Sequence, residues 1–172
     1  VEINCGTPPL GRFRDKGTPV DNLSNYDSSQ ERMLYVAPVG QLRSDRLLFV
    51  TKTSMCKLVE GAEFDVAKRT IASTKLADED ELIFIGSASE MEQIVLQSHG
   101  GCFLRFLTQE VSTMKKTALG VRGMKLADDD YLEHAYLLAG HQEYTISYHD
   151  KEYALNKVRL AKRDTKGIKP RI

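Results

Sequence analysis

Residues 47–58 read LLFVTKTSMCKL, an apolar run followed by a polar turn and a second, shorter strand-like run. The same layout returns 47 residues later, where Ile94–Gln97 leads into Gly101–Arg105. A third copy runs from Tyr144–Tyr148 through a polar turn to Tyr153–Leu155. Two strand-like runs joined by a short turn predict a β-hairpin, so we expect one hairpin in each copy.

A basic loop follows each hairpin. The copies of this loop are Lys68–Leu76, Lys115–Leu126 and Lys162–Lys169, with an earlier relative at Arg12–Gly17. Acidic turns come next and lead into further apolar runs. These pairs of turn and run are Asp78–Glu81 with Leu82–Ile85, Asp128–Asp130 with Tyr131–Leu138, and Asp27–Glu31 with Met33–Val36. The order of hairpin, basic loop, acidic turn and strand therefore recurs along the chain.

A period of 40 to 50 residues with several short strands in each unit is typical of propeller blades. A β-sandwich also has short strands, but it does not explain the recurring order. The sequence predicts an all-β fold of three to four blades, each of four antiparallel strands. The expected units are 1–45, 46–92, 93–142 and a partial unit 143–172. Single helical turns are expected near Glu60–Val66 and Leu107–Met114. Because the pattern starts and stops partway through a unit, we expect a piece of a longer protein.

Composition narrows the class of protein. The chain of 172 residues is 41% hydrophobic and 28% charged, as in a globular domain, and it holds no apolar run long enough to span a membrane. We therefore expect a cytoplasmic protein. The three cysteines are Cys5, Cys56 and Cys102, too few and too scattered for a disulfide framework or a zinc cluster. Lys plus Arg equals Asp plus Glu at 24 each, so binding of a polyanion would depend on local clustering of charge.

The segment 120–126, GVRGMKL, together with Leu104-Arg105-Phe106 before it and an acidic turn after it, resembles a blade repeat of a known family. That family is the C-terminal DNA-wrapping domain of bacterial type II topoisomerase A subunits, of gyrase and topoisomerase IV. The stretches 16–23, 47–58 and 75–83 resemble neighbouring blades of the same family. The similarity covers nearly the whole chain.

The resemblance implies a β-pinwheel, in which neighbouring blades exchange strands and duplex DNA bends around a basic outer rim. It implies no catalytic centre and no cofactor in this chain, since the cleavage tyrosine of the family lies in another domain. The expected partners are double-stranded DNA, the remainder of the A subunit in an A2B2 holoenzyme, and the B subunit, which carries ATP and Mg. The expected location is the nucleoid, and gyrase is favoured over topoisomerase IV.

Two features depart from the family pattern. Thr70 and Ala72 stand where we match Gly120 and Arg122 of the next unit, which makes DNA contact by the loop 68–76 less expected. The glycine-rich basic heptapeptide of gyrases is absent, since residues 114–120 have its spacing without its paired glycines. In the family that heptapeptide belongs to the first blade, so its absence does not separate gyrase from topoisomerase IV.

The candidate DNA contacts are the cations and glycines of the basic loops. Lysine and arginine pair with phosphate, and a bare glycine backbone lets N–H groups approach phosphate oxygens. The glycines equally suit a tight turn, and both interpretations remain open. The predicted residues are Arg12, Arg14, Lys16, Lys68, Arg69, Lys115, Lys116, Gly120, Arg122, Gly123, Lys162, Arg163, Lys166 and Gly167. Lys68 and Arg69 are weaker candidates, as are Lys169 and Arg171, and Gly17 is a further bare position.

Two other functions remain as alternatives. A propeller whose loops hold a peptide or a partner subunit would show an exposed mixed patch and binding that is insensitive to salt. An enzyme is less favoured, because the four histidines form no arrangement with Ser, Cys or carboxylate that signals nucleophilic catalysis. We expect no metal site, since Asp128–Asp130 lacks the spacing of ligands and the glycine of a calcium loop and instead suits a solvated turn.

Overall fold

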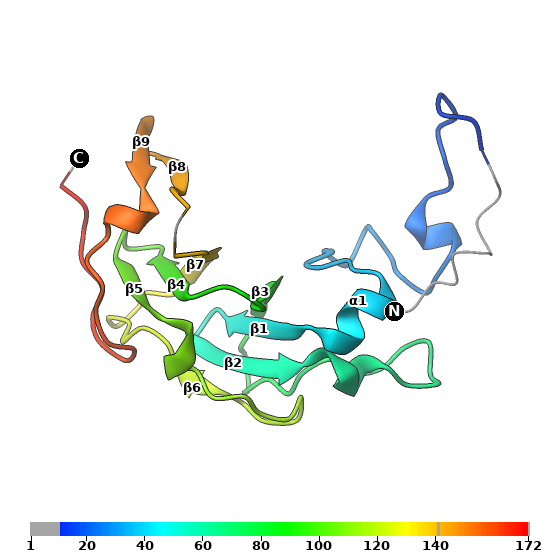
Figure 1. The fold of residues 1–172 in the computed structure, drawn as a ribbon, viewed down its shortest axis with the longest axis horizontal. Coiled ribbons are helices and arrows are strands. Elements are labelled where there is room, and N and C mark those ends of the chain that lie inside the picture. The colour runs from blue at the N-terminus through cyan, green and yellow to red at the C-terminus, as the bar shows by residue number, and fades with distance from the viewer. Residues whose placement is uncertain (1–10, 141, 172) are drawn as a thin grey trace.

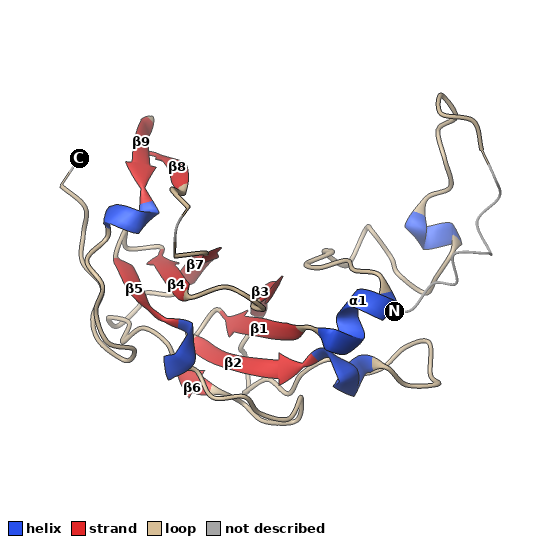
Figure 2. Ribbon diagram, viewed as in Figure 1, coloured by secondary structure: helices blue, strands red, loops and turns tan. Residues whose placement is uncertain are grey.

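Three antiparallel sheets follow one another along the chain in the computed structural model, which describes residues 11–140 and 142–171 (Figure 1). The first sheet has the strand order β3-β1-β2-β6, the second β5-β4-β7, and the third is the hairpin β8-β9. Helical segments are short and lie between the strands (Figure 2). The predicted all-β fold is confirmed.

The first sheet is built on the hairpin of β1 (Arg46–Thr51) and β2 (Met55–Glu60). Val50 lies opposite Cys56, and Ser54 turns the chain with a φ of 72°. β3 (Leu82–Ser87) pairs with the other side of β1. Both central strands are buried over almost their whole length, as the continuous apolar run of β1 predicts for that strand.

The second and third sheets repeat this plan. β4 (Gln93–Ser98) and β5 (Phe103–Leu107) form the second hairpin, and β7 (Leu132–Leu138) pairs with β4. β8 (Thr145–Tyr148) and β9 (Lys151–Ala154) form the third. All three predicted hairpins are therefore present, as are strands at the apolar runs 82–85 and 131–138.

Neighbouring sheets exchange a strand. β6 (Val121–Arg122) follows the second hairpin in sequence, yet it pairs with β2 of the first sheet, with Val121 opposite Cys56. The same contact recurs in the next unit, where Phe103 and Ile168 exchange two backbone hydrogen bonds of 2.8 Å. Cys56 to Phe103 and Val121 to Ile168 are both steps of 47 residues. Each of these basic loops is thus bound to the hairpin of the preceding unit.

Short 3-10 helices close the hairpins at η2 (Gly61–Phe64), η3 (Thr108–Glu110) and η4 (Leu155–Lys157). The first two lie where single helical turns were predicted. The described residues 11–45 contain η1 (Val20–Asn22) and α1 (Val39–Ser44) but no strand. The expected strand at 33–36 is not formed; its counterparts β3 and β7 each pair with the first strand of the hairpin that precedes them, and no such strand precedes 33–36 among the described residues.

The core lies between successive sheets. Leu48 and Leu58 of the first sheet pack with Leu96 and Phe106 of the second, and all four are at most 1% exposed. Val95 and Phe103 join the second sheet to Leu155 behind the third. Burial of each such side chain contributes about 1.5–3 kcal/mol, so the seams between sheets hold the units in place. Along residues 11–140 and 142–171, no helix is long and apolar enough to cross a membrane.

Candidate nucleic-acid interface

Three basic pairs occupy one position of the repeat. They are Lys68–Arg69, Lys115–Lys116 and Lys162–Arg163, separated by 47 residues each time. The observed strand pairing confirms this spacing, and it corrects the match made from sequence alone. Ser73 and Lys75, rather than Thr70 and Ala72, correspond to Gly120 and Arg122. The loop 65–81 therefore does carry a cation, Lys75, at the position of Arg122. The apparent departure from the family pattern at Thr70 and Ala72 came from aligning the two loops three residues out of register.

The loop 111–126 is bound along β2 by its backbone. The N–H of Leu58 donates to the carbonyl of Ser112 at 3.2 Å, and the N–H of Met114 donates to the carbonyl of Leu58 at 2.7 Å. At the other end of β2, the N–H of Gly123 donates to the carbonyl of Ser54 at 2.7 Å. The loop is thus fixed on both sides of the segment that carries Lys115 and Lys116.

The buried side chain of Lys57 forms hydrogen bonds with the backbone in the middle of this loop. The residue is only 2% exposed, and its ammonium donates to the carbonyls of Lys116 at 2.7 Å and Ala118 at 2.6 Å. It also lies 5.7 Å from the ring centroid of Phe49. Burial lowers the pKa of Lys57, and the charge of Glu63 opposes that shift. A buried ammonium needs such partners, so Lys57 fixes the path of the backbone between residues 116 and 118.

The predicted glycines pack against strands. A Cβ at Gly120, whose φ is 108°, would lie 2.7 Å from the carbonyl oxygen of Cys56, and one at Gly167 would lie 2.9 Å from that of Phe103. Gly123 is buried, and its N–H is already bonded to Ser54. These contacts favour the tight-packing interpretation of the glycines. Their role toward phosphate stays a prediction.

The second member of each bound pair joins a glutamate of the preceding unit. The N–H of Lys116 donates to Glu63 Oε2 at 3.0 Å, and its Nζ lies 3.4 Å from the carbonyl of Glu63. One repeat later, the N–H of Arg163 donates to Glu110 Oε2 at 2.9 Å and its Nε to the carbonyl of Glu110 at 3.0 Å. Glu63 and Glu110 are also 47 residues apart. We call these two contacts the glutamate clamps.

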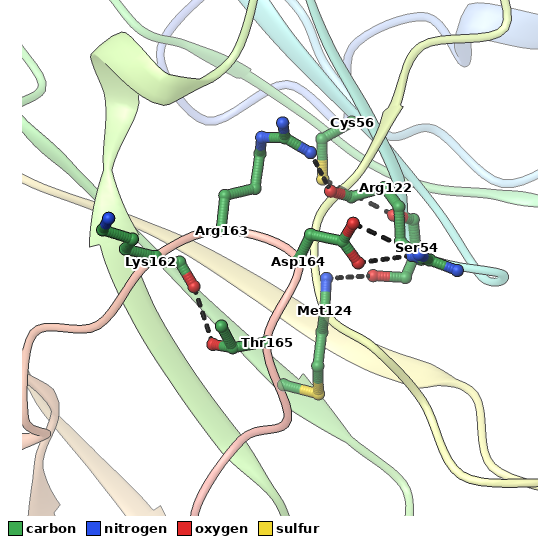
Figure 3. A network of polar contacts seen from close by, with 8 residues as sticks. All are labelled: Ser54, Cys56, Arg122, Met124, Lys162, Arg163, Asp164 and Thr165. Carbon is green, nitrogen blue, oxygen red and sulfur yellow. Dashed lines mark hydrogen bonds and ion pairs between the residues drawn. The ribbon is translucent and has the colours of Figure 1, made fainter.

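The first member of each bound pair faces solvent. The side chain of Lys115 is 82% exposed and forms only an ion pair of 3.3 Å with Glu63. Lys162 is exposed, and Figure 3 shows its side chain pointing away from the surrounding polar network. A surface ion pair of this kind contributes little, about 0–1 kcal/mol, and Lys115 is therefore able to exchange it for another anion. In both bound pairs, the first cation (Lys115 or Lys162) is exposed to solvent. The second cation (Lys116 or Arg163) is bonded to a glutamate of the preceding unit.

Arg122 is also engaged. Its Nε lies 2.5 Å from Asp164 Oδ1, and its carbonyl accepts a hydrogen bond of 2.6 Å from Arg163 Nη1 (Figure 3). The hydrogen bond from Arg122 lowers the pKa of Asp164 and raises that of Arg122. Half of the Arg122 side chain is still exposed. It is therefore a weaker candidate for phosphate contact than Lys115 or Lys162.

The loop 65–81 has fewer contacts to a preceding unit among the described residues, and the positions 47 residues before β2 (8–13) lie partly outside them. Lys68 and Arg69 are exposed, and the contact to the neighbouring loop is a backbone bond of 3.1 Å from Lys75 to the carbonyl of Lys116. The residue 47 positions before Glu63 is Lys16, so the glutamate clamp has no acidic counterpart here. Both members of this basic pair therefore remain on the surface.

The remaining predicted cations fall into two groups. Arg12, Arg14 and Lys16 are exposed on a turn in which the N–H of Arg12 donates to Asp15 Oδ2 at 2.6 Å. In Figure 1 this blue segment lies at the opposite end of the molecule from the red segment 158–171. Lys166, Lys169 and Arg171 are exposed in that last segment. The structure thus brings the last three basic loops along neighbouring sheets and leaves 12–16 apart from them.

The acidic turns serve as caps for the hairpins. Asp80 accepts hydrogen bonds from the N–H of Thr53 at 3.0 Å and from its hydroxyl at 2.6 Å, and Asp130 accepts one of 2.9 Å from Gly100. Burial opposes ionisation of both carboxyls, but the hydrogen bonds outweigh it and lower their pKa. Sequence reasoning treated these turns as solvated and missed this role, as it missed Lys57 and the glutamate clamps. The shared 47-residue step between Glu63 and Glu110 was the available signal.

The cysteines that the structure describes are free thiols, Cys56 buried and Cys102 half-buried, and Cys5 lies outside the described residues. Burial raises the pKa of Cys56 to about 12, so its thiol stays protonated at neutral pH. In the part of the chain with described coordinates, no three His, Cys, Asp or Glu side chains gather to hold a metal.

Comparison with known proteins gives a consistent result. A family model described as the DNA gyrase C-terminal domain, β-propeller, matches residues 45–89 and 92–139. The chain is 28% identical to the A subunit of DNA gyrase from Ureaplasma parvum over 93% of its length, covering 19% of that relative. It is 33% identical to the A subunit of DNA gyrase from Salmonella typhimurium over 67% of its length, covering 13% of that relative. The chain thus spans less than a fifth of the length of these two curated relatives.

A solved structure is similar as well. The C-terminal domain of DNA topoisomerase IV superimposes with a TM-score of 0.79 at 25% sequence identity, over 91% of this chain and 50% of that one. The likeness in structure therefore extends beyond the residues that the family model matches.

Proposed function

Because this chain belongs to the DNA gyrase C-terminal domain family, we propose that it binds duplex DNA without reading its sequence and bends the duplex around the edge that carries the basic loops. Binding of this kind needs cations along a curved path and no contacts to base edges. Bending a duplex over a few helical turns costs several kcal/mol, so the contacts must be spread over several units. A repeat with one basic loop in each unit spreads the phosphate contacts over several units in this way.

The observation that carries the proposal is that a solvent-exposed lysine occupies the same repeat position in both bound loops. Lys115 and Lys162 stand 47 residues apart on loops whose backbones are fixed to the preceding hairpin, and both side chains face solvent. A fixed loop loses little conformational freedom when its lysine meets a phosphate. Lys68 occupies the same position on the loop that has fewer contacts to a preceding unit among the described residues.

The proposal extends to the whole protein. We infer that the chain serves an ATP-dependent type II DNA topoisomerase in the cytoplasm, near the nucleoid. Cleavage would come from the remainder of the A subunit, while the B subunit of an A2B2 holoenzyme would supply ATP hydrolysis with Mg. Between the two enzyme types gyrase is preferred, a preference that comes from the sequence. Introduction of negative supercoils by the reconstituted holoenzyme would support gyrase, and decatenation without supercoiling would contradict that preference.

Salt dependence of binding tests the DNA proposal. We expect the affinity for a 40-base-pair duplex to fall linearly on a log–log plot against salt, by about 0.9 log units per phosphate contact for each tenfold rise in salt. Two unrelated duplex sequences should give the same affinity and slope. Absence of binding at low salt would contradict the proposal.

The alternative, a protein-interaction module, has one observation in its favour. A groove of about 610 Å³ lies between the first two sheets and is lined by Leu58, Met91, Leu107 and Val111 among polar residues. Thr108 also lines it, and its buried hydroxyl has no partner among the described residues. Binding of a peptide in this groove would be insensitive to salt, which separates the two functions in the same titration.

A further inference from the structure

A second cavity lies between the second and third sheets, apart from Lys115 and Lys162. It has a volume of about 420 Å³ and is lined by Lys151, Lys169, His149, Tyr148 and the turn Gly100–Gly101, together with Pro170. We propose that this notch binds a backbone phosphate of duplex DNA. The inference deepens the proposed function and rests on it, because it adds a contact site at the end of the last basic loop.

The notch carries charged side chains, whereas the equivalent seam one repeat earlier is apolar. Forty-seven residues before Lys151 on β9 is Leu104 on β5, which packs into the apolar seam between the first two sheets. Leu104 is 2% exposed. The first seam is therefore closed by an apolar side chain at the position where the second seam carries an ammonium.

The backbone explains why the second seam stays open. In the first seam, Gly123 and Met124 donate their N–H groups to the carbonyl and the hydroxyl of Ser54, both at 2.7 Å. One repeat later Pro170 replaces Gly123 and has no N–H, and Gly101 replaces Ser54 and has no hydroxyl. The bonds that close the first seam therefore cannot form there, and an open notch results.

Gly101 also shapes the notch. Its φ is 78°, and a Cβ on this residue would lie 2.5 Å from the hydroxyl of Tyr148. The glycine therefore admits the phenol, which is held edge-on against Phe103 with ring centroids 5.1 Å apart. A phenol O–H fixed in this way is a hydrogen-bond donor for a phosphate oxygen.

The electrostatics favour an anion. Among the described residues, no carboxylate lines the notch, and neither Lys151 nor Lys169 forms a side-chain hydrogen bond or ion pair. The carboxylate of Asp130 lies next to Gly100 and is already bonded to the N–H groups of Gly100 and Tyr131 at 2.9 Å each. Two ammonium groups, a phenol and an imidazole around one opening match the charge and the acceptors of a phosphate.

The test uses the full-length protein that contains this chain and a 40-base-pair duplex. We expect Lys151→Gln with Lys169→Gln to weaken duplex binding roughly fivefold at low salt and to reduce the log–log salt slope by about 0.9, the value for one phosphate contact. The control is Lys157→Gln, an exposed lysine on η4 outside the notch, which should leave affinity and slope unchanged.

A second variant separates a loss of DNA binding from a loss of folding. Lys151→Leu restores the residue of the closed seam, so it should keep or raise the thermal midpoint while weakening duplex binding. Titrations of His149 ring resonances with inorganic phosphate and with the duplex then separate a free anion from DNA. Shifts with the duplex at a lower concentration than with phosphate support the proposal, and shifts with phosphate alone contradict it.

The outcomes distinguish this inference from the proposed function. If Lys151 and Lys169 variants bind like the wild type while Lys115→Gln with Lys162→Gln binds more weakly, the notch is overturned and the DNA-binding function stands. If the wild type itself does not bind the duplex, both are overturned.

Discussion

The loops 65–81 and 111–126 carry the same kind of basic pair at the same position of the repeat, yet the molecule treats them differently. The second loop is bound to the preceding hairpin by Lys57, by a glutamate clamp at Glu63 and by β6. The first contributes no strand among the described residues, and Lys16 stands where its clamp would require an acid. The positions that correspond to Met55 and Cys56 are Pro8 and Pro9, which lie outside the described residues. A basic pair in this fold therefore has no fixed role of its own.

In the two bound loops, the glutamate of the preceding unit sorts the cations. Where an acidic partner is available, the second cation joins the two units and the first faces solvent, as with Lys116 and Lys115. Where no such partner exists, both cations remain on the surface, as with Arg69 and Lys68. A count of basic residues in the loops is therefore larger than the number of cations that are available to contact DNA phosphates.

The largest expected effect comes from breaking the close packing of the bound loop. Gly120→Ala adds a Cβ 2.7 Å from the Cys56 carbonyl at a φ of 108°, and we expect it to destabilise the protein by about 2–4 kcal/mol. The matched control is Ser73→Ala at the same repeat position, which should change stability by less than about 0.5 kcal/mol. Urea unfolding measures both, and equal midpoints would refute the distinction between the loops.

A smaller effect is expected from Lys57→Met. The substitution keeps the length of the side chain but leaves the Ala118 carbonyl without this donor, while Lys116 retains the bond from Lys75. We expect a loss of about 1–2 kcal/mol and faster amide exchange confined to residues 115–119. Unchanged exchange in that segment would show that Lys57 does not hold the loop.

The smallest expected effect is a dependence on pH. The N–H of Lys116 lowers the pKa of Glu63 below its ordinary value of 4.5, so the ionised carboxylate stabilises the fold. That stabilisation is complete above the unfolded pKa and is lost as the pH falls through the lower folded pKa. We therefore expect Glu63→Gln to be less stable than the wild type at pH 7 and nearly equal to it at pH 3. A constant difference across this range would contradict the clamp.

The sequence predicted the parts of the fold that depend on local pattern. Apolar runs with a short turn between them predicted all three hairpins, and the periodicity predicted repeated units. Blade boundaries at 45, 92 and 142 remain a prediction. The position of Gly120 against a strand was one of two interpretations left open, and only the observed contact favours it.

The family resemblance implied an exchange of strands between units, but the residues that make the contacts between units were not predicted. β6 is two residues long, too short for any periodicity, and its pairing with β2 is visible only in three dimensions. Lys57 resembles an ordinary strand residue in sequence, because burial of its ammonium depends on carbonyls 59 and 61 positions away. The helix α1 likewise lacks a periodic apolar face and was not expected.

The most direct measurement compares two double variants of the same charge change, Lys115→Gln with Lys162→Gln and Lys116→Gln with Arg163→Gln. We expect the first to reduce the salt slope of duplex binding by about 1.8 while its thermal midpoint stays unchanged. The second should lower the midpoint by about 4 °C and largely keep the slope. If both variants lose the same slope at unchanged thermal midpoints, the sorting of cations by the preceding unit is wrong.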